Sequence, residues 1–390
     1  MHNGVVVAEG MILKKKPLIS AWIGQGNFGD ELLSYGLRLE LCKAFDIERF
    51  SYYEKGYDKI YVSADEPEIA SLNTDGMRRW RRIFRNYLQF YKGYDSLFFG
   101  GGSILHSSHS VDWKYNLLRR FRYSRLLSSS IAGAVGISVG PFSDASVEYK
   151  VGRFLSELDV IHCRDKASVE FVRKLECRGQ IIDGRDLAFS VRAMRPHLFE
   201  KKIKHGYIGA SFILDPKLNA VEQSEQFHKI LSVVNLISGL GYKLILVSLY
   251  TGRKYSDHHL HRRLRDASRE PSMIELVDYT GDVPSTISQI ASCDFYISMR
   301  LHGAVTAYLA AVPFFAISSH PKMIEFCLDI FGESETSNLG ALSMAGDELL
   351  ELLRNSIALS KKQPTYTVGQ DDKYYMSSSE FARAVGGGYG

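Results

Sequence analysis

The chain has 390 residues, of which 45% are hydrophobic and 24% are charged, and its formal net charge is +4. This length and balance indicate a globular protein of about two domains, and so small an excess of positive charge does not indicate a nucleic-acid-binding protein. The five cysteines form no CxxC pair, so neither a zinc site nor a disulfide framework is predicted.

Targeting and membrane segments are not indicated either. The apolar block at residues 5–8 is too short for a signal peptide and is soon followed by three lysines. No apolar run reaches the ~18 residues that cross a bilayer. We therefore expect a cytoplasmic protein.

The first half of the chain alternates apolar, strand-like runs with helix-like periodic runs, which is the pattern of α/β folds with parallel sheets. We expect Asp30 to cap the first of the helices. Strands are predicted over 18–23, 96–99, 134–139 and 160–163, and helices over 30–43 and 166–175.

The periodicity fails over residues 191–205, which are rich in Arg and Lys and contain a proline, so we predict a linker there. The predicted domains are therefore 1–190 and 206–343, followed by a closing helix and a loose tail over 344–390. In the second half, strands are predicted over 207–212, 243–249, 274–277, 295–298 and 314–317, and helices over 220–238, 286–292, 304–311, 322–331 and 345–360. Two Rossmann-like domains facing a cleft form the GT-B arrangement, which is the predicted fold class.

Residues 298–304, Ser-Met-Arg-Leu-His-Gly-Ala, join a predicted strand to a predicted helix. In open α/β sheets, ligands bind at the carboxyl ends of strands, and the N-terminus of the following helix favours anions. Arg300 supplies a planar fork for a carboxylate or phosphate, and His302 is suited to acid–base chemistry near neutral pH. Although a lone Arg or His at a strand end is usually structural, this pair in one turn predicts a site that binds a small anion and moves a proton.

Two glycine-rich stretches also follow predicted strands. Residues 24–31, Gly-Gln-Gly-Asn-Phe-Gly-Asp-Glu, do not complete the dinucleotide fingerprint, so a tight turn lining the cleft is favoured over NAD binding. Residues 100–103, Gly-Gly-Gly-Ser, lack the lysine of a P-loop. Packing of helix on sheet and contact with a substrate are equally good interpretations of these glycines.

The segment 78–126 is strongly basic and carries aromatic and apolar residues at helical spacing. An ordinary helix with its apolar stripe in the core is the favoured interpretation. A peripheral membrane contact through 78–126, at the inner face of the membrane, is the alternative.

Taken in order, the motifs of this chain resemble those of the polysaccharide pyruvyl transferase family. The resemblance covers most of the chain, about residues 18–331, and Arg-Leu-His-Gly at 300–303 is its most specific part. The matching stretches are residues 26–31, 100–103, 164–168, 186–189, 298–304 and 312–313, with Lys322 beyond.

The resemblance implies a GT-B-like fold and transfer of a pyruvyl group from phosphoenolpyruvate to a sugar of an exopolysaccharide or its precursor, giving a pyruvate ketal and phosphate. It implies His302 as the general acid, and no metal or cofactor. The phosphoenolpyruvate-binding residues would be Arg300, Arg164, Leu301 and Lys322. The acceptor-side residues would be Gly26, Asn27, Asp30, Gly101, Gly102 and Ser103.

Two other functions stay open on the sequence. A GT-B glycosyltransferase that uses a nucleotide sugar is the main alternative, and it would bind UDP rather than phosphoenolpyruvate. A non-catalytic scaffold of a polysaccharide assembly complex is the other. The acceptor sugar, and whether it is lipid-linked, are not specified by any motif.

Overall fold

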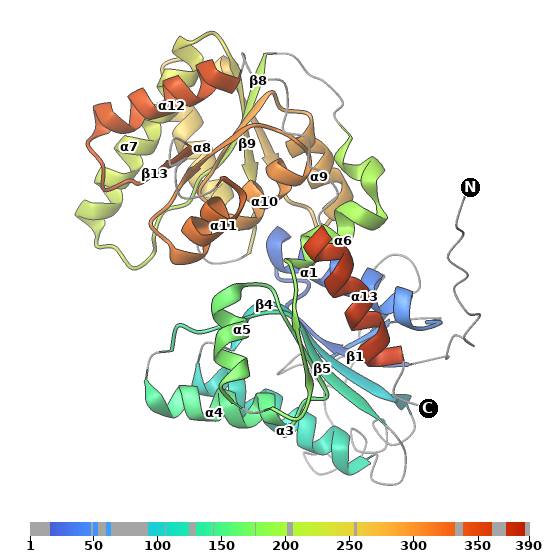
Figure 1. The fold of residues 1–390 in the computed structure, drawn as a ribbon. Coiled ribbons are helices and arrows are strands. Elements are labelled where there is room, and N and C mark those ends of the chain that lie inside the picture. Colours follow the sequence, from blue (N-terminus) through green and yellow to red (C-terminus); the bar gives the residue numbers. More distant parts are fainter. Residues whose placement is uncertain are drawn as a thin grey trace, which may run out of the picture. The chain divides into compact units, whose positions relative to one another are not determined.

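The computed structural model contains two compact units. Unit 1 comprises residues 1–22, 33–190 and 372–390, and unit 2 comprises residues 23–32 and 191–371. The described residues are 16–47, 50–53, 60–63, 93–105, 107–124, 130–142, 144–175, 177–200, 206–252, 256–331, 338–360 and 372–386. Figure 1 shows a sheet flanked by helices in both units.

Unit 1 is built on a seven-stranded sheet with the order β3-β2-β1-β4-β5-β6-β7. All neighbouring strands are parallel except β2 and β3. The strand order reverses between β1 and β4, which makes their carboxyl ends the switch point of the sheet. The strands are β1 (Pro17–Ser20), β2 (Phe50–Tyr53), β3 (Ile60–Ser63), β4 (Ser96–Leu105), β5 (Ile131–Val139), β6 (Val160–Cys163) and β7 (Gln180–Asp183).

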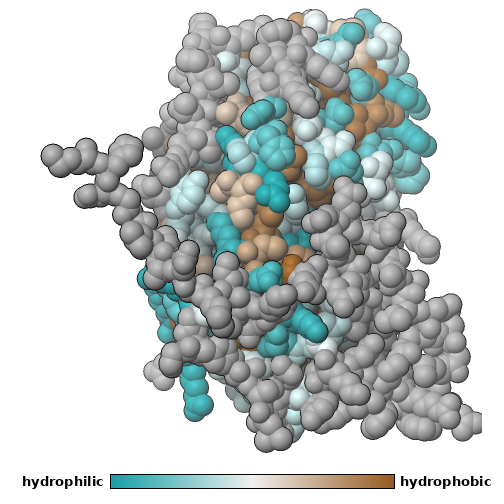
Figure 2. Space-filling view, turned by 90° about the vertical axis from the view of Figure 1, so that its right-hand side faces the viewer, coloured by the Kyte–Doolittle hydropathy of each residue, from teal (hydrophilic) through white to brown (hydrophobic). Residues whose placement is uncertain are grey.

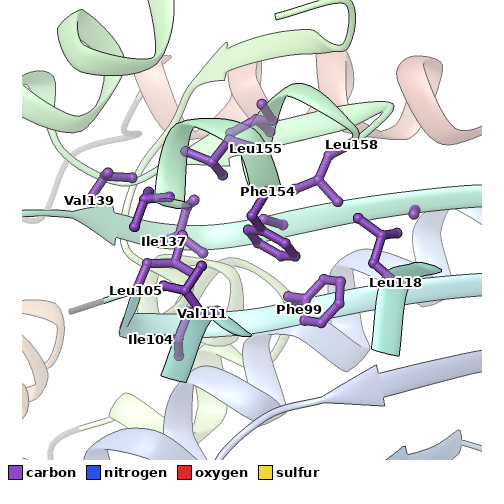
Figure 3. Close-up of a cluster of buried hydrophobic side chains, with 14 of the residues drawn as sticks. Phe99, Ile104, Leu105, Val111, Leu118, Ile137, Val139, Phe154, Leu155 and Leu158 are labelled. Carbon is purple, nitrogen blue, oxygen red and sulfur yellow. The ribbon is translucent and has the colours of Figure 1, made fainter. Parts of the chain in front are cut away.

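Helices cover both faces of this sheet because its inner strands are apolar on both sides. Successive residues of β4 point to opposite faces: the ring of Phe99 meets that of Phe154 at 4.9 Å, whereas Phe98 lies near Phe45 and Phe381. Figure 3 shows the cluster around Phe99 and Phe154. The helices are α1 (Phe28–Ala44), α3 (Ser108–Ser124), α4 (Ala145–Ser156), α5 (Lys166–Arg173), α6 (Leu187–Met194) and α13 (Asp372–Gly386). Residues 28–32 of α1 and 191–194 of α6 are part of unit 2.

The glycine triplet lies inside β4 rather than after it. A side chain on Gly100 would overlap Leu37, and one on Gly101 would overlap Leu33, both on α1. Gly101 and Gly102 also have positive φ angles, +53° and +81°, which glycine adopts at little cost. The structure therefore supports the packing interpretation for Gly100 and Gly101, while the side chain of Ser103 lies outside the described residues.

Unit 2 contains a fully parallel sheet with the order β10-β9-β8-β11-β12-β13. The order reverses between β8 and β11, so the switch point of this sheet lies where those two strands end. The strands are β8 (Tyr207–Ser211), β9 (Lys243–Ser248), β10 (Ile274–Asp278), β11 (Phe295–Ser298), β12 (Phe314–Ile317) and β13 (Leu339–Gly340). The helices are α7 (Ala220–Gly239), α8 (Asp257–Ala267), α9 (Val283–Ala291), α10 (Leu301–Leu309), α11 (Pro321–Phe331) and α12 (Gly346–Ser360).

The C-terminal region differs from the predicted loose tail. Residues 372–386 form α13, which packs in unit 1 with Phe381 and Val385 buried. The buried carboxylate of Glu40 accepts hydrogen bonds from Tyr374 (2.8 Å) and Ser378 (2.6 Å). Hydroxyl and aromatic side chains thus anchor a helix whose apolar residues were too widely spaced to be recognised as a core face.

The predicted linker at 191–205 begins within a helix. α6 extends to Met194 and a short 3-10 helix covers Pro196–Phe199, while residues 201–205 lie outside the described part. Proline at the first position of the 3-10 helix needs no backbone hydrogen bond there, which explains why the helical periodicity fails at this point.

Only part of the basic segment 78–126 can be assessed, because residues 78–92 lie outside the described residues. Within α3, Lys114 is buried and donates to the carbonyls of Ile104 and Ser110, and Arg122 pairs with Asp159 at 2.7 Å. Among the described residues, no helix is long and apolar enough to cross a membrane. Figure 2 shows hydrophilic and hydrophobic residues interspersed on one face.

Candidate functional site

The carboxyl ends of β8 and β11 are joined by two buried serines. The hydroxyls of Ser211 and Ser298 lie 3.0 Å apart, and Ser298 donates to the carbonyl of Arg300 at 2.7 Å. A side chain on Gly303 would overlap both hydroxyls, so glycine is required for α10 to begin this close to the strand ends. This turn fixes where Arg300 and His302 leave the sheet.

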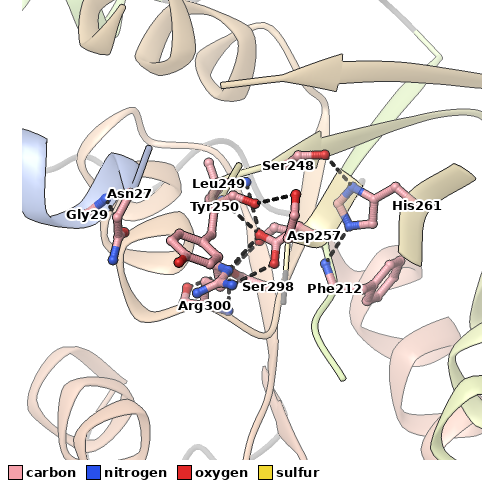
Figure 4. Close-up of polar contacts among 12 residues, drawn as sticks. Asn27, Gly29, Phe212, Ser248, Leu249, Tyr250, Asp257, His261, Ser298 and Arg300 are labelled. Atoms are coloured by element: carbon pink, nitrogen blue, oxygen red, sulfur yellow. Dashed lines mark hydrogen bonds and ion pairs between the residues drawn. The ribbon is translucent and has the colours of Figure 1, made fainter. Parts of the chain in front are cut away.

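Arg300 forms a two-pronged ion pair with Asp257 (Figure 4). Nε donates to Oδ2 at 2.7 Å and Nη2 donates to Oδ1 at 2.5 Å. The guanidinium also lies over the ring of Tyr250, with 5.5 Å between Cζ and the ring centroid. The Arg300 side chain is 25% exposed, whereas that of Asp257 is 2% exposed. The carboxylate is therefore enclosed, and the guanidinium side chain reaches the surface of unit 2.

Asp257 is the first residue of α8 and is held by the backbone as well. Its Oδ2 accepts hydrogen bonds from the amides of Leu249 (3.1 Å) and Tyr250 (3.0 Å). Burial raises the pKa of this carboxyl, while Arg300 and the two amides act in the opposite direction and favour the carboxylate. Asp257 therefore places a fixed negative charge next to the Arg300 guanidinium.

His261, one turn further along α8, supports the same region. Its Nε2 accepts from the amide of Phe212 (3.1 Å) and its Nδ1 lies 3.1 Å from the hydroxyl of Ser248 (Figure 4). Burial lowers the pKa of His261 to about 3, so the ring is neutral, and the accepting role of Nε2 places the proton on Nδ1. His261 thereby ties α8 to the ends of β8 and β9.

Residues 24–28 pair with the segment that follows β9. Phe28 donates its amide to the carbonyl of Leu249 (2.9 Å), and Thr251 donates to the carbonyl of Gly26 (2.8 Å). These bonds explain why residues 23–32 belong to unit 2, whereas the sequence placed them in the first domain. Asn27 caps α1 through the amide of Gly29 and donates to Asp30 at 2.6 Å. The prediction that Asp30 is the cap was wrong, because the helix begins at Phe28 and Asp30 lies in its first turn.

The Glu31 carboxylate binds both the loop at residues 24–28 and Tyr279. It accepts a 2.5 Å hydrogen bond from the hydroxyl of Tyr279 and further bonds from the amides of Gly24 and Gly26. Burial raises the pKa of Glu31, and these bonds oppose the shift. Burial and the nearby carboxylate raise the pKa of Tyr279. The glycines, Asn27 and Glu31 thus have clear structural roles in this turn.

His302 packs against the start of α1. A side chain on Gly29 would overlap the imidazole of His302 at Nδ1, so the backbone of α1 approaches the ring closely. The Nε2 atom of His302 is buried, and its backbone carbonyl accepts from Thr306 at 2.6 Å. The ring is therefore held in a narrow space beside the Arg300 turn.

Arg164 lies in unit 1 and is occupied by internal partners. Its Nε donates to Ser138 (2.6 Å) and its Nη1 pairs with Asp186 (2.7 Å), with only 7% of the side chain exposed. Asp186 in turn accepts from the amide of Ala188 at the start of α6. The stretch that contains Arg164 is thus explained by the packing of unit 1, and we do not retain Arg164 as a ligand of phosphoenolpyruvate.

Lys322 lies in the first turn of α11, after β12. Its amide donates to Nδ1 of His320 at 3.3 Å. Burial lowers the pKa of His320, and the charges of Lys322 and Lys217 act in the same direction. Lys322 and Arg300 follow β12 and β11, which are neighbouring strands of one sheet, and a role for Lys322 in binding the donor stays a prediction.

Asp257, His261 and Tyr279 were not recognised from the sequence. Helix α8, which carries the first two, has a strongly polar composition with three histidines and three arginines, so its short apolar stripe was missed. A Ser-Asp pair at a helix start was the available signal. Among the described residues, no group of three or more His, Cys, Asp or Glu side chains is placed to hold a metal ion.

Comparisons with known proteins identify the family of the chain and its class of fold. The sequence model of the polysaccharide pyruvyl transferase family matches residues 27–321, more than half of the chain. The fold resembles that of UDP-GlcNAc 2-epimerase from Methanocaldococcus jannaschii, with 10% identity, 96% of this chain and 100% of that chain covered, and a TM-score of 0.59. A putative UDP-N-acetylglucosamine 2-epimerase from Listeria monocytogenes gives 11% identity, 95% and 96% coverage and a TM-score of 0.56.

The Methanocaldococcus epimerase in complex with UDP-GlcNAc and UDP gives 10% identity, 96% and 100% coverage and a TM-score of 0.55. At these identities the similarity concerns the fold alone, and it confirms the predicted GT-B class with two Rossmann-like units.

Proposed function

The chain belongs to the polysaccharide pyruvyl transferase family, and from this premise we propose that it transfers a pyruvyl group from phosphoenolpyruvate to a sugar. The acceptor would be a sugar of an exopolysaccharide or its lipid-linked precursor, and the product a pyruvate ketal. The reaction as proposed uses phosphoenolpyruvate as a substrate and needs no cofactor.

The proposed reaction balances with two sugar hydroxyls. A proton is added to the methylene carbon of phosphoenolpyruvate, which gives an oxocarbenium-like carbon that the first hydroxyl attacks. The second hydroxyl then displaces phosphate and closes the ring. Of the two hydroxyl protons, one ends on the new methyl group and the other on phosphate.

The observation that carries the proposal is the placement of Arg300 at the switch point of the unit 2 sheet. Phosphoenolpyruvate is a small anion, and Asp257 engages the Nε and Nη2 atoms of Arg300 while part of the side chain remains exposed. A guanidinium held in this way can bind a carboxylate or phosphate without having to be ordered first. Leu301, Lys322 and the N-terminus of α10 would complete the donor site.

We assign proton delivery to His302, which lies two residues after Arg300 and packs against Gly29. The Nε2 atom of His302 is shielded from solvent, so a proton given up by this atom would be transferred away from bulk water. Exclusion of water favours attack by a sugar hydroxyl over hydrolysis.

Thermal unfolding with phosphoenolpyruvate, UDP or buffer tests the proposal in wild type, Arg300→Ala, His302→Ala and the control Arg265→Ala. Arg265 is an exposed arginine of α8 that pairs with Asp266. Each shift is measured from the ligand-free midpoint of the same variant, because Arg300→Ala also leaves Asp257 without its partner. Ligand at 100 times its Kd should add about 2.7 kcal/mol of stability.

We expect phosphoenolpyruvate to raise the midpoint of wild type, His302→Ala and Arg265→Ala, and to leave Arg300→Ala unchanged. His302→Ala should at the same time lose acceptor-dependent release of phosphate. A shift with UDP alone would reject the pyruvyl-transfer proposal and favour a GT-B glycosyltransferase that uses a nucleotide sugar.

A further inference from the structure

Arg300 is restrained on two sides by groups that no family motif of this chain contains. Asp257 engages its Nε and Nη2 atoms, and the ring of Tyr250 lies against its face. We infer that Asp257 is a positioning residue, which sets the plane of the Arg300 guanidinium so that Nη1 meets the carboxylate or phosphate of the donor. This inference rests on the proposed function of the same site.

The Asp257 carboxylate is fixed by the backbone rather than by flexible side chains. Its Oδ2 accepts from two consecutive amides, those of Leu249 and Tyr250, directly after β9. Only 2% of the Asp257 side chain is exposed, so the carboxylate is enclosed by closely packed neighbours. The position of the guanidinium is therefore determined by the end of β9, a rigid part of the sheet.

A second contact holds the helix that carries Asp257. His261 lies four residues later on α8 and bonds to the amide of Phe212 after β8 and to Ser248 at the end of β9. α8 is thus tied to the two neighbouring strand ends, and Arg300 follows β11, which pairs with β8. The three strand ends together define one geometry for the guanidinium.

The surface pair Arg265–Asp266 on the same helix shows what an incidental ion pair looks like. Its side chains are 39% and 64% exposed, and the two residues are adjacent in sequence. Such pairs contribute little and impose no fixed orientation. Asp257, in contrast, joins Arg300 across 43 residues of sequence and is bound at both oxygens.

Positioning and simple charge balance predict opposite results when the carboxylate is neutralised. If Asp257 only lowered the positive potential, Asp257→Asn would tighten the binding of an anion. If Asp257 positions the guanidinium, Asp257→Asn weakens the binding of phosphoenolpyruvate. A misplaced guanidinium is expected to lower the affinity on the order of 10- to 100-fold. Asp257→Glu separates the two effects further, since it keeps the charge and moves it by one methylene.

Isothermal titration calorimetry of phosphoenolpyruvate binding, together with the rate of phosphate release, distinguishes positioning of the guanidinium from simple charge balance. We expect the Kd to rise roughly tenfold or more in both Asp257→Asn and Asp257→Glu. The matched control Asp266→Asn should leave the Kd unchanged. Thermal unfolding of each variant confirms that the protein measured is folded, and Asp257→Glu provides the test if Asp257→Asn does not fold.

A double-mutant cycle with Arg300→Lys distinguishes positioning from a general structural role. If Asp257 acts through Arg300, Asp257→Asn should change the Kd by less than twofold once Arg300 is lysine. Additive effects, or an unchanged or tighter Kd in Asp257→Asn, would overturn the inference while leaving the proposed function intact. Absence of phosphoenolpyruvate binding to wild type would overturn both.

Discussion

Each unit of this protein contains an Arg–Asp pair next to the end of a parallel strand. In unit 1, Arg164 follows β6 and contacts Asp186 at 2.7 Å. In unit 2, Arg300 follows β11 and contacts Asp257 at 2.5 Å. The exposed fractions of the side chains differ: 7% and 12% in the first pair, and 25% and 2% in the second.

The difference lies in which partner is enclosed and in what else the arginine binds. Arg164 also donates to Ser138, so its guanidinium is used up inside unit 1. Arg300 gives two donors to an enclosed carboxylate and keeps part of its side chain at the surface. An arginine at a strand end is therefore a candidate ligand only when its counter-ion, and not the guanidinium, is the buried member.

The largest effect that would test this comparison is expected for Arg164→Ala. Removing one member of a buried pair leaves an uncompensated charge, so unit 1 should lose about 3–5 kcal/mol of unfolding free energy. The affinity of the folded protein for phosphoenolpyruvate should not change. Urea unfolding and calorimetric titration measure the two quantities separately.

Lys150→Ala is the matched control in the same unit. Lys150 pairs with Asp112 at 2.9 Å, but both side chains are well exposed, so we expect a loss of less than about 1 kcal/mol. Weaker phosphoenolpyruvate binding by folded Arg164→Ala would show that the first pair also contributes to the site, and the comparison would then fail.

A smaller loss of unfolding free energy is expected when low pH protonates His261, the histidine on the helix that carries Asp257. The unfolded chain binds a proton on His261 near the ordinary pKa of about 6.5, whereas the folded chain does so only near 3. The unfolding free energy is thus unaffected by His261 above pH 6.5 and falls as the pH drops from 6.5 towards 3. Between pH 7 and pH 5 the loss from this histidine should be about 2 kcal/mol.

Urea unfolding of wild type and His261→Gln at pH 7 and pH 5 measures this contribution. The variant should be less stable at pH 7 and should lose less stability on acidification than wild type. His259→Gln, at an exposed position of the same helix, should follow wild type. Equal loss of stability between pH 7 and pH 5 in wild type and His261→Gln would mean that folding does not hinder protonation of His261 in this pH range, and the prediction would be wrong.

Much of this structure follows from periodicity in the sequence. The predicted strands 160–163, 295–298 and 314–317 coincide with β6, β11 and β12, because buried parallel strands are short, continuous apolar runs. The Arg300 turn could be placed at a strand end for the same reason. Polar contacts between distant residues could not be found in this way, since neither Asp257 nor Tyr279 belongs to a local pattern that indicates its partner.

Helices with weak apolar stripes were the other limit. Besides their few buried apolar residues, α8 and α13 are held by polar side chains, among them His261 in α8 and Tyr374 and Ser378 in α13. Their partners lie far away in the chain, so the spacing of apolar residues carries little information about them. The glycines at 24–31 likewise could be assigned to a turn, but the pairing of that turn with residues 249–251 appears only in three dimensions.

The smallest effect is expected for a substitution of Gly29. It separates the proposed role of Arg300 in binding the donor from the proposed role of His302 in proton transfer. A methyl group at this position would overlap the imidazole of His302, while no atom of Arg300 is among its near contacts. Gly29→Ala should therefore displace His302 and lower kcat about tenfold, the equivalent of roughly 1.4 kcal/mol. The Kd for phosphoenolpyruvate should stay within about twofold of wild type, because Arg300 and Asp257 are untouched.

Gly239→Ala is the control for this substitution, because Gly239 ends α7 and an added methyl group there meets nothing within 4 Å. Alanine is also the better helix former, so lower helix propensity cannot account for a loss of activity in Gly29→Ala. A change of kcat with constant Kd would assign proton transfer to His302 and binding to Arg300. A rise of Kd with constant kcat would instead place the imidazole in the anion clamp, and the division of roles between the two residues would have to be reversed.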